Sequence, residues 1–264
     1  MKTLGFILAG MLLQVAVLAQ TQTDRPATEA EIKRDRLVEL NGLITQVNAA
    51  AQAKDWPKTK ELVEKLLAAN AQLAAAYPND PGFPGSEPEY YNLLGNAHLN
   101  LGEYEEAIAV YKKGIGLAQG LGDGGKYSPE LKKAMAVAFT SEGNACLKLR
   151  KDKEALACYE QAAQLDPNPA TAWFNLCATR YNMGDMDGAV AAADKVIALD
   201  PTKADAYFIK GSALFGNGTV DASGKFVVSA EAMAALRKYL ELASNGGHAG
   251  DVKAMLDASG VSVK

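Results

Sequence analysis

A spacing of 34 residues recurs along the second half of this 264-residue sequence. The aromatic residues Phe139, Trp173 and Tyr207 follow one another at this interval. Small residues and prolines recur at the same interval, in the pairs Ala155/Ala189 and Pro167/Pro201. A unit of this length cannot bury its own apolar face, so repeats of this kind stack side by side. The sequence therefore predicts a stack of similar units rather than one globular core.

Two insertions lengthen the repeat toward the N-terminus. Tyr91 and Phe139 are 48 residues apart, which is 14 more than the basic period. Stretches rich in glycine and proline, at 77–88 and 116–129, account for the additional residues and predict loops. In the last unit, short β-branched runs within 216–229 flank a turn and predict a small β-hairpin.

These positions resemble the tetratricopeptide repeat, a helix-turn-helix unit of about 34 residues with aromatic, Leu-Gly, Ala-x-x-x-aromatic and proline positions. The resemblance is strongest in 88–119, 136–169 and 170–203 and partial in 204–243. It implies an all-α fold, a right-handed α-solenoid of antiparallel helix pairs. The sequence departs from the pattern at four positions, Glu142, Cys177, Ala193 and Lys210.

The residues themselves favour close packing within each pair. Small residues on first helices are expected to face alanines on second helices, so that antiparallel backbones approach closely. These are Gly95, Gly143 and Gly211, facing Ala107, Ala155 and Ala189. Beyond the last pair, Val252, Met255 and Leu256 share one helical face and predict a capping helix at about 248–259.

These patterns divide the chain into nine segments. The expected order is a signal peptide at 1–19, a disordered N-terminus at 20–28, a degenerate helix pair with its linker at 29–87, a repeat at 88–119, a glycine-rich loop at 120–135, repeats at 136–169 and 170–203, a repeat with the inserted hairpin at 204–243, and a capping helix at 244–264.

The N-terminus predicts export. Met1-Lys2 precedes an apolar run at 4–19, and Val17-Leu18-Ala19 has the small-residue pattern of a signal peptidase site, so we place the cut after Ala19. The run is shorter than the roughly 20 residues that span a bilayer as a helix, which leaves an uncleaved anchor as the alternative. We expect a periplasmic or secreted protein without stable membrane insertion after cleavage.

Three cysteines, Cys146, Cys158 and Cys177, lie within apolar helical patterns. In such a setting a cysteine usually serves as a small buried apolar group. Because an oxidising compartment favours disulfides, a Cys146–Cys158 bridge is the alternative.

Charge and motifs argue against several function classes. The 27 basic and 31 acidic residues are mixed along the chain, which disfavours nucleic acid as a partner. The stretch Gly120–Gly125 fits G-x-G-x-x-G in letters, but a helical pattern precedes it instead of a strand, so we interpret it as a loop. His98 falls on a first helix as a core or groove-edge residue with no nucleophile placed beside it. We therefore expect no catalytic residues, no metal site and no cofactor.

The remaining candidate site is the concave surface that first helices line in such a solenoid. Asparagine amides can donate to and accept from the backbone of an extended peptide, and aromatic rings give apolar contact at low entropic cost. Projecting the helical spacing places ten candidate residues on this surface: Asn92, Asn96, Thr140, Asn144, Lys148, Phe174, Asn175, Tyr181, Phe208 and Ser212. They predict a groove that is polar at one end and aromatic at the other. The alternative is that they are ordinary solvated or packing residues of a scaffold.

The resemblance also suggests a comparison with repeat proteins that clamp the C-terminal carboxylate of chaperone tails with lysines and an arginine. Here Asn92 stands where a lysine is expected, and Lys148 is the only cation among the candidates. We expect a non-enzymatic scaffold that binds a protein or peptide outside the cytoplasm. The alternatives are a self-associating structural subunit of the cell envelope and an enzyme with a site on the inserted loops.

Overall fold

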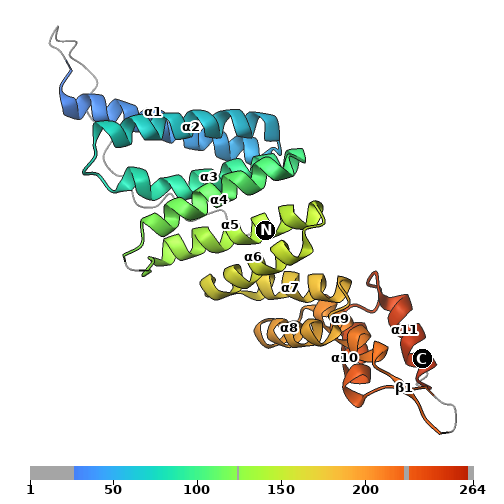
Figure 1. The fold of residues 1–264 in the computed structure, drawn as a ribbon. Helices are drawn as coiled ribbons and strands as arrows, with labels where there is room; N and C mark the ends of the chain where they lie inside the picture. The colour runs from blue at the N-terminus through green and yellow to red at the C-terminus, as the bar shows by residue number, and fades with distance from the viewer. Residues whose placement is uncertain (1–26, 124, 223–225, 261–264) are drawn as a thin grey trace.

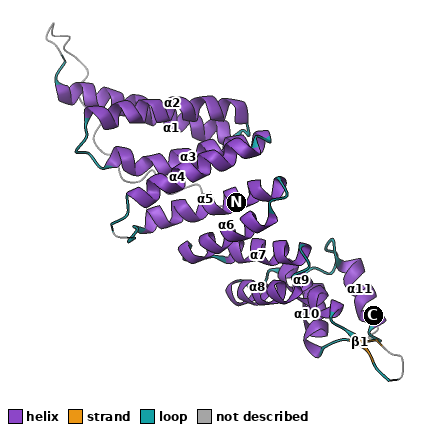
Figure 2. Cartoon of the chain, in the orientation of Figure 1, coloured by secondary structure: helices purple, strands orange, loops and turns teal. Residues whose placement is uncertain are grey.

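The computed structural model describes residues 27–123, 125–222 and 226–260. In this part of the chain, α-helices follow one another as antiparallel pairs that stack along a curved axis (Figure 1; Figure 2). The helices are α1 (Glu29–Gln52), α2 (Trp56–Ala76), α3 (Gly82–Leu101), α4 (Tyr104–Gly120), α5 (Pro129–Lys148), α6 (Asp152–Leu165), α7 (Ala170–Asn182), α8 (Met186–Leu199), α9 (Ala204–Gly216), α10 (Ala230–Leu242) and α11 (Ala249–Ala258). The predicted all-α solenoid is confirmed. The expected signal peptide at 1–19 lies outside the described residues.

The core runs through the stack as three apolar clusters. The first joins α1 and α2 to α3, the second extends from α4 to α9, and the third joins α9 and α10 to α11. Each helix packs mainly on the helices that precede and follow it. Stability is therefore distributed along the chain, because each pair buries the apolar face of its neighbour.

The glycines of the first helices allow large side chains to approach the backbone. A Cβ atom at Gly143 would lie 2.6 Å from Cε1 of Tyr159, and one at Gly211 would lie 2.7 Å from Cδ2 of Leu236. At Gly95 the ring of Tyr111 occupies the corresponding space. The atoms nearest these glycines thus belong to two tyrosine rings and a leucine.

Two predicted loops are shorter than expected, because parts of them are helical. Helix α5 begins at Pro129, so the loop spans 121–128 instead of 120–135. Proline suits the first helical position, and the Ser128 side chain accepts a hydrogen bond from Leu131 N. Helix α3 begins at Gly82 and contains Pro88, which shortens the expected linker in the same way.

The turns within pairs share one backbone conformation. Gly102 and Gly184 have φ angles of 80° and 81°. Lys54 and Arg150 take the same left-handed conformation in the turns after α1 and α5, with φ angles of 57° and 60°. Side chains are disfavoured in this region of backbone space, so these two turns store strain that the glycine turns avoid.

The hairpin and the final helix complete the C-terminal end. Strands β1 (Thr219–Val220) and β2 (Phe226–Val227) pair antiparallel, as predicted. The ring of Phe226 lies 5.1 Å from that of Phe215 and ties the hairpin to α9. On α11, Val252 and Leu256 are fully buried against the last pair.

Cys146, Cys158 and Cys177 are buried and free, so the alternative of a Cys146–Cys158 bridge is wrong. Burial raises the pKa of Cys177 to about 12, with a further contribution from the charge of Asp194. Among the described helices, none is both long enough and apolar enough to cross a membrane.

Candidate functional site

An asparagine on α5 is held in place by a tyrosine from the core. Because Gly143 has no side chain, the ring of Tyr159 on α6 lies directly against α5. The hydroxyl group of Tyr159 donates a hydrogen bond of 2.8 Å to Oδ1 of Asn144, the residue after this glycine. The asparagine therefore faces the surface while its carbonyl oxygen is engaged from within.

The same arrangement occurs one repeat earlier. On α3, the missing side chain of Gly95 admits the ring of Tyr111, which comes from α4. The Tyr111 hydroxyl donates a hydrogen bond of 2.7 Å to Oδ1 of Asn96. Asn96 and Asn144 thus share a local geometry on neighbouring first helices.

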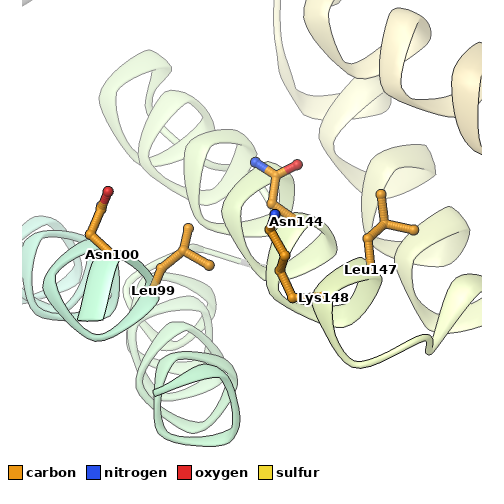
Figure 3. A pocket seen from close by; sticks show the side chains of 5 residues that line it. All are labelled: Leu99, Asn100, Asn144, Leu147 and Lys148. Carbon is orange, nitrogen blue, oxygen red and sulfur yellow. The ribbon is translucent and has the colours of Figure 1, made fainter. Parts of the chain in front are cut away.

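A pocket of about 570 Å³ opens between the C-terminal ends of α3 and α5 (Figure 3). Its lining combines apolar, amide and cationic side chains, and contains no carboxylate: Leu99, Asn100, Asn144, Leu147 and Lys148. Asn144 and Lys148 are one helical turn apart on α5, so both face the same space. This composition suits an extended segment with a hydrogen-bond acceptor and an aliphatic or anionic group.

Sequence reasoning missed the two leucines of the pocket. Leu99 and Leu147 follow Asn96 and Asn144 by three residues, which is the spacing of neighbours on one helical face. This signal was present in the sequence, but leucines at such positions are usually attributed to the core.

Two predicted groove residues are not on the concave surface. Asn92 is buried, and its Nδ2 donates a hydrogen bond of 2.9 Å to the carbonyl oxygen of Ala134 on α5. Ser212 is also buried, with its hydroxyl 3.8 Å from Sδ of Met255 on α11. Both predictions were wrong for one reason: the following first helix, or the cap in its place, covers this position.

The aromatic end of the predicted groove is largely occupied by the chain itself. Phe208 stacks on His248, with ring centroids 3.8 Å apart and planes inclined by 5°. Nζ of Lys203 lies 4.5 Å from the ring centroid of Phe174. Three other candidates are half-buried: Thr140, Asn175 and Tyr181. The Thr140 hydroxyl donates a hydrogen bond to the carbonyl oxygen of Ala136 on its own helix. Among the ten candidates only Lys148 is exposed, so the surface is most open at the polar end.

His98 has a structural role between helices. It is 8% exposed, and its Nδ1 lies 2.6 Å from Oε2 of Glu103. Nζ of Lys60 on α2 lies 2.7 Å from the same carboxylate oxygen. The hydrogen bond from Lys60, supported by His98, lowers the pKa of Glu103. This network fixes the turn between α3 and α4 against α2.

Among the described residues, no group of three or more histidine, cysteine, aspartate or glutamate side chains could hold a metal ion.

Glu142, at a leucine position of the repeat, should make stability depend on pH. Burial raises its pKa, although Lys112 and Cys158 oppose the rise. The native state then holds this proton more tightly than the unfolded chain, so the free energy of unfolding should fall as pH rises from the ordinary glutamate range through the raised pKa. Glu142→Gln should lack this fall in urea unfolding between pH 4 and pH 8. The exposed Glu105→Gln serves as control, and equal pH profiles for wild type and Glu142→Gln would contradict the prediction.

Family models identify the repeats. Models of the tetratricopeptide repeat match residues 88–120, 143–184 and 179–227. The chain carries tetratricopeptide repeats. A model of the vWA-MoxR associated protein middle region matches residues 16–78, which include the helix pair α1–α2 that precedes the matched repeats.

Solved structures share the fold of this tetratricopeptide stack. A crystal structure of MamA protein is 20% identical, has a TM-score of 0.53, and the match covers 78% of this chain and 92% of MamA. YrrB, described as a TPR protein with an unusual peptide-binding site, is 20% identical with a TM-score of 0.52 over 80% of this chain and 90% of YrrB. A tetratricopeptide repeat protein from Parabacteroides merdae is 13% identical with a TM-score of 0.56 over 83% of this chain and 74% of that protein.

Curated relatives match over part of their length. The Hsp70-Hsp90 organizing protein of Triticum aestivum is 30% identical over 108 residues, or 41% of this chain and 16% of that protein. The co-chaperone sgt12 of Aspergillus fumigatus is 28% identical over 129 residues, 49% of this chain and 34% of sgt12. Human protein O-mannosyl-transferase TMTC3 is 24% identical over 179 residues, 66% of this chain and 18% of TMTC3. The chain thus spans no more than 34% of the length of these relatives.

Proposed function

We propose that this protein is a non-enzymatic scaffold that binds an extended segment of another protein across the C-terminal ends of α3 and α5. The observation that carries the proposal is the pocket in which Asn144 and Lys148 lie beside Leu99 and Leu147. The amide and the ammonium group can donate hydrogen bonds to backbone or carboxylate oxygens of a guest, and the leucines can cover an aliphatic side chain.

The relatives support a protein as the partner. Two of them are named as an Hsp70-Hsp90 organizing protein and a heat-shock cognate co-chaperone. A complete carboxylate clamp is disfavoured here, because Asn92 is buried and bonded to Ala134 in place of an exposed lysine. We therefore propose a guest that is held mainly through its backbone and one anionic or aliphatic group near Lys148.

We also propose that the protein works outside the cytoplasm. The apolar run at 4–19 and the small-residue pattern that ends at Ala19 support this location. Mass spectrometry of the protein from its native source should find Gln20 at the mature N-terminus. Retention of Met1–Ala19 in the purified protein would contradict the cleavage.

The binding proposal can be tested with random 12-residue peptides displayed on phage and selected on the purified full chain. Enriched peptides, synthesised and measured by calorimetry, should bind with a dissociation constant in about the micromolar range. Lys148→Glu should weaken this binding by about tenfold or more, because it reverses the charge in the pocket. Lys195→Glu, at an exposed position of α8, makes the same charge change away from the pocket and should bind as wild type does. No enrichment, or equal affinity for Lys148→Glu and wild type, would overturn the proposal.

A further inference from the structure

The direction of the two asparagine amides is determined by buried tyrosines. Tyr111 and Tyr159 are both fully buried, and each O–H donates to the Oδ1 of an asparagine. Burial raises the pKa of both phenols, so each hydroxyl keeps its proton and remains a donor. When the phenol holds the amide oxygen in this way, the Nδ2 group of the same amide points away from the phenol.

The freed ends of these amides are available to a guest. Within the described residues, no protein acceptor takes the Nδ2 hydrogens of Asn96 or Asn144. Figure 3 shows the Asn144 side chain projecting from α5 near Lys148. Asn96 and Asn144 therefore each offer a donor at the polar end of the concave surface, at points separated by about the 8–10 Å between packed helix axes.

The tyrosine and the asparagine are lost together in the next repeat. Thirty-four residues after Gly143, Asn144 and Tyr159 stand Cys177, Ala178 and Ala193. Cys177 and Ala193 are both fully buried in the central cluster, so side chains of other sizes fill the space there. The donor is absent from the surface where the phenol is absent from the core. The last repeat keeps the glycine as Gly211, but Ser212 and Leu236 stand in place of the asparagine and the tyrosine.

We propose that Tyr111 and Tyr159 are positioning residues that make this surface specific for hydrogen-bond acceptors, namely carbonyl or carboxylate oxygens of an extended guest. They never touch the guest and act through Asn96 and Asn144. The inference rests on the proposed peptide-binding function, but it concerns the orientation of the amides and can be measured without a guest. Without the hydroxyl, an asparagine amide can rotate and present either its oxygen or its nitrogen to the groove.

The first experiment measures the side-chain amides in the full chain by NMR. In wild type, the 15N order parameter of the Asn144 side chain should be near that of rigid backbone, about 0.85, and in Tyr159→Phe it should fall below about 0.6. Asn96 should respond in the same way to Tyr111→Phe. Tyr91→Phe serves as control. It also removes a tyrosine hydroxyl, but the Tyr91 ring lies 4.7 Å from Nζ of Lys113, and Asn96 and Asn144 take their hydrogen bonds from Tyr111 and Tyr159. Unchanged order parameters in Tyr111→Phe and Tyr159→Phe would overturn the inference.

The second experiment separates positioning from a purely structural role, in which the asparagine only satisfies a buried hydroxyl. Asn144→Asp keeps an acceptor for Tyr159 but has no donor for a guest. With a phage-selected peptide as probe, positioning requires a five- to tenfold or larger loss of affinity in both Asn144→Asp and Tyr159→Phe, as expected for one hydrogen bond. A structural role predicts that Tyr159→Phe, which changes no charge, binds the peptide as wild type does, and this result would overturn the inference. If no peptide is selected, the proposed function fails while the order parameters still decide the positioning.

Discussion

Gly143→Ala is expected to destabilise the protein by about 2–3 kcal/mol. The added methyl carbon would lie 2.6 Å from Cε1 of Tyr159, and that ring is fully buried and anchored through its hydroxyl to Asn144. Neither the ring nor the backbone of α5 can yield without separating the two helices of the pair. Urea unfolding followed by circular dichroism measures the effect as a lower transition midpoint.

A second glycine provides the matched control. Gly116 lies within α4 at an exposed position, and a Cβ atom there would meet nothing within 4 Å. Gly116→Ala should therefore stabilise the protein by up to about 1 kcal/mol, since alanine has the higher helix propensity. An equal change of the unfolding midpoint in both variants would contradict the prediction, because it would show that the close approach of the Tyr159 ring is not the reason for glycine at position 143.

Leu256→Ala should remove about 3 kcal/mol from the stability of the C-terminal cap. Leu256 is fully buried in the cluster that joins α11 to Leu236 and Tyr239. Because units of a solenoid contact only their neighbours, the loss should be local. Hydrogen exchange should show reduced protection in α11 and α10, with α3 to α6 unchanged.

Leu242→Ala makes the same chemical change at the end of α10, where the side chain is 37% exposed. It should cost less than about 1 kcal/mol and leave the protection of α11 intact. Loss of protection throughout the stack in Leu256→Ala would contradict local unfolding and show that the cap is coupled to the whole chain.

The helix pairs could be predicted from the sequence because a stack imposes the same packing at every unit. Glycines such as Gly143 recur where a neighbour's side chain must approach, and Gly102 and Gly184 recur where the chain reverses. Arg150 could not be predicted as a left-handed turn residue, since nothing local favours that conformation. It adopts it because the packing of α5 on α6 requires a turn of this shape.

The candidate site was less predictable than the fold. Helical spacing locates a residue on a face, but the next helix decides whether that face is open. Asn92 and Asn144 both project from first helices, yet α5 covers Asn92 while Asn144 borders a pocket. The hydrogen bond from Tyr159 to Asn144 joins residues that are 15 apart in sequence and lie on different helices, and the sequence pattern alone did not predict it.

The N-terminal ends of α3 and α5 form one rim of the solenoid and their C-terminal ends form the other, and the two rims differ in length variation and in composition. The additional residues of the longer repeats extend the N-terminal ends of α3 and α5, next to the connections at 77–81 and 121–128. The pocket lies at the opposite ends of the same two helices, near Asn100 and Lys148. A helix of 20 residues is about 30 Å long, so the two rims are separated by nearly that distance. Insertions or deletions at one rim can therefore change the length of this chain while the proposed binding surface at the other rim stays the same.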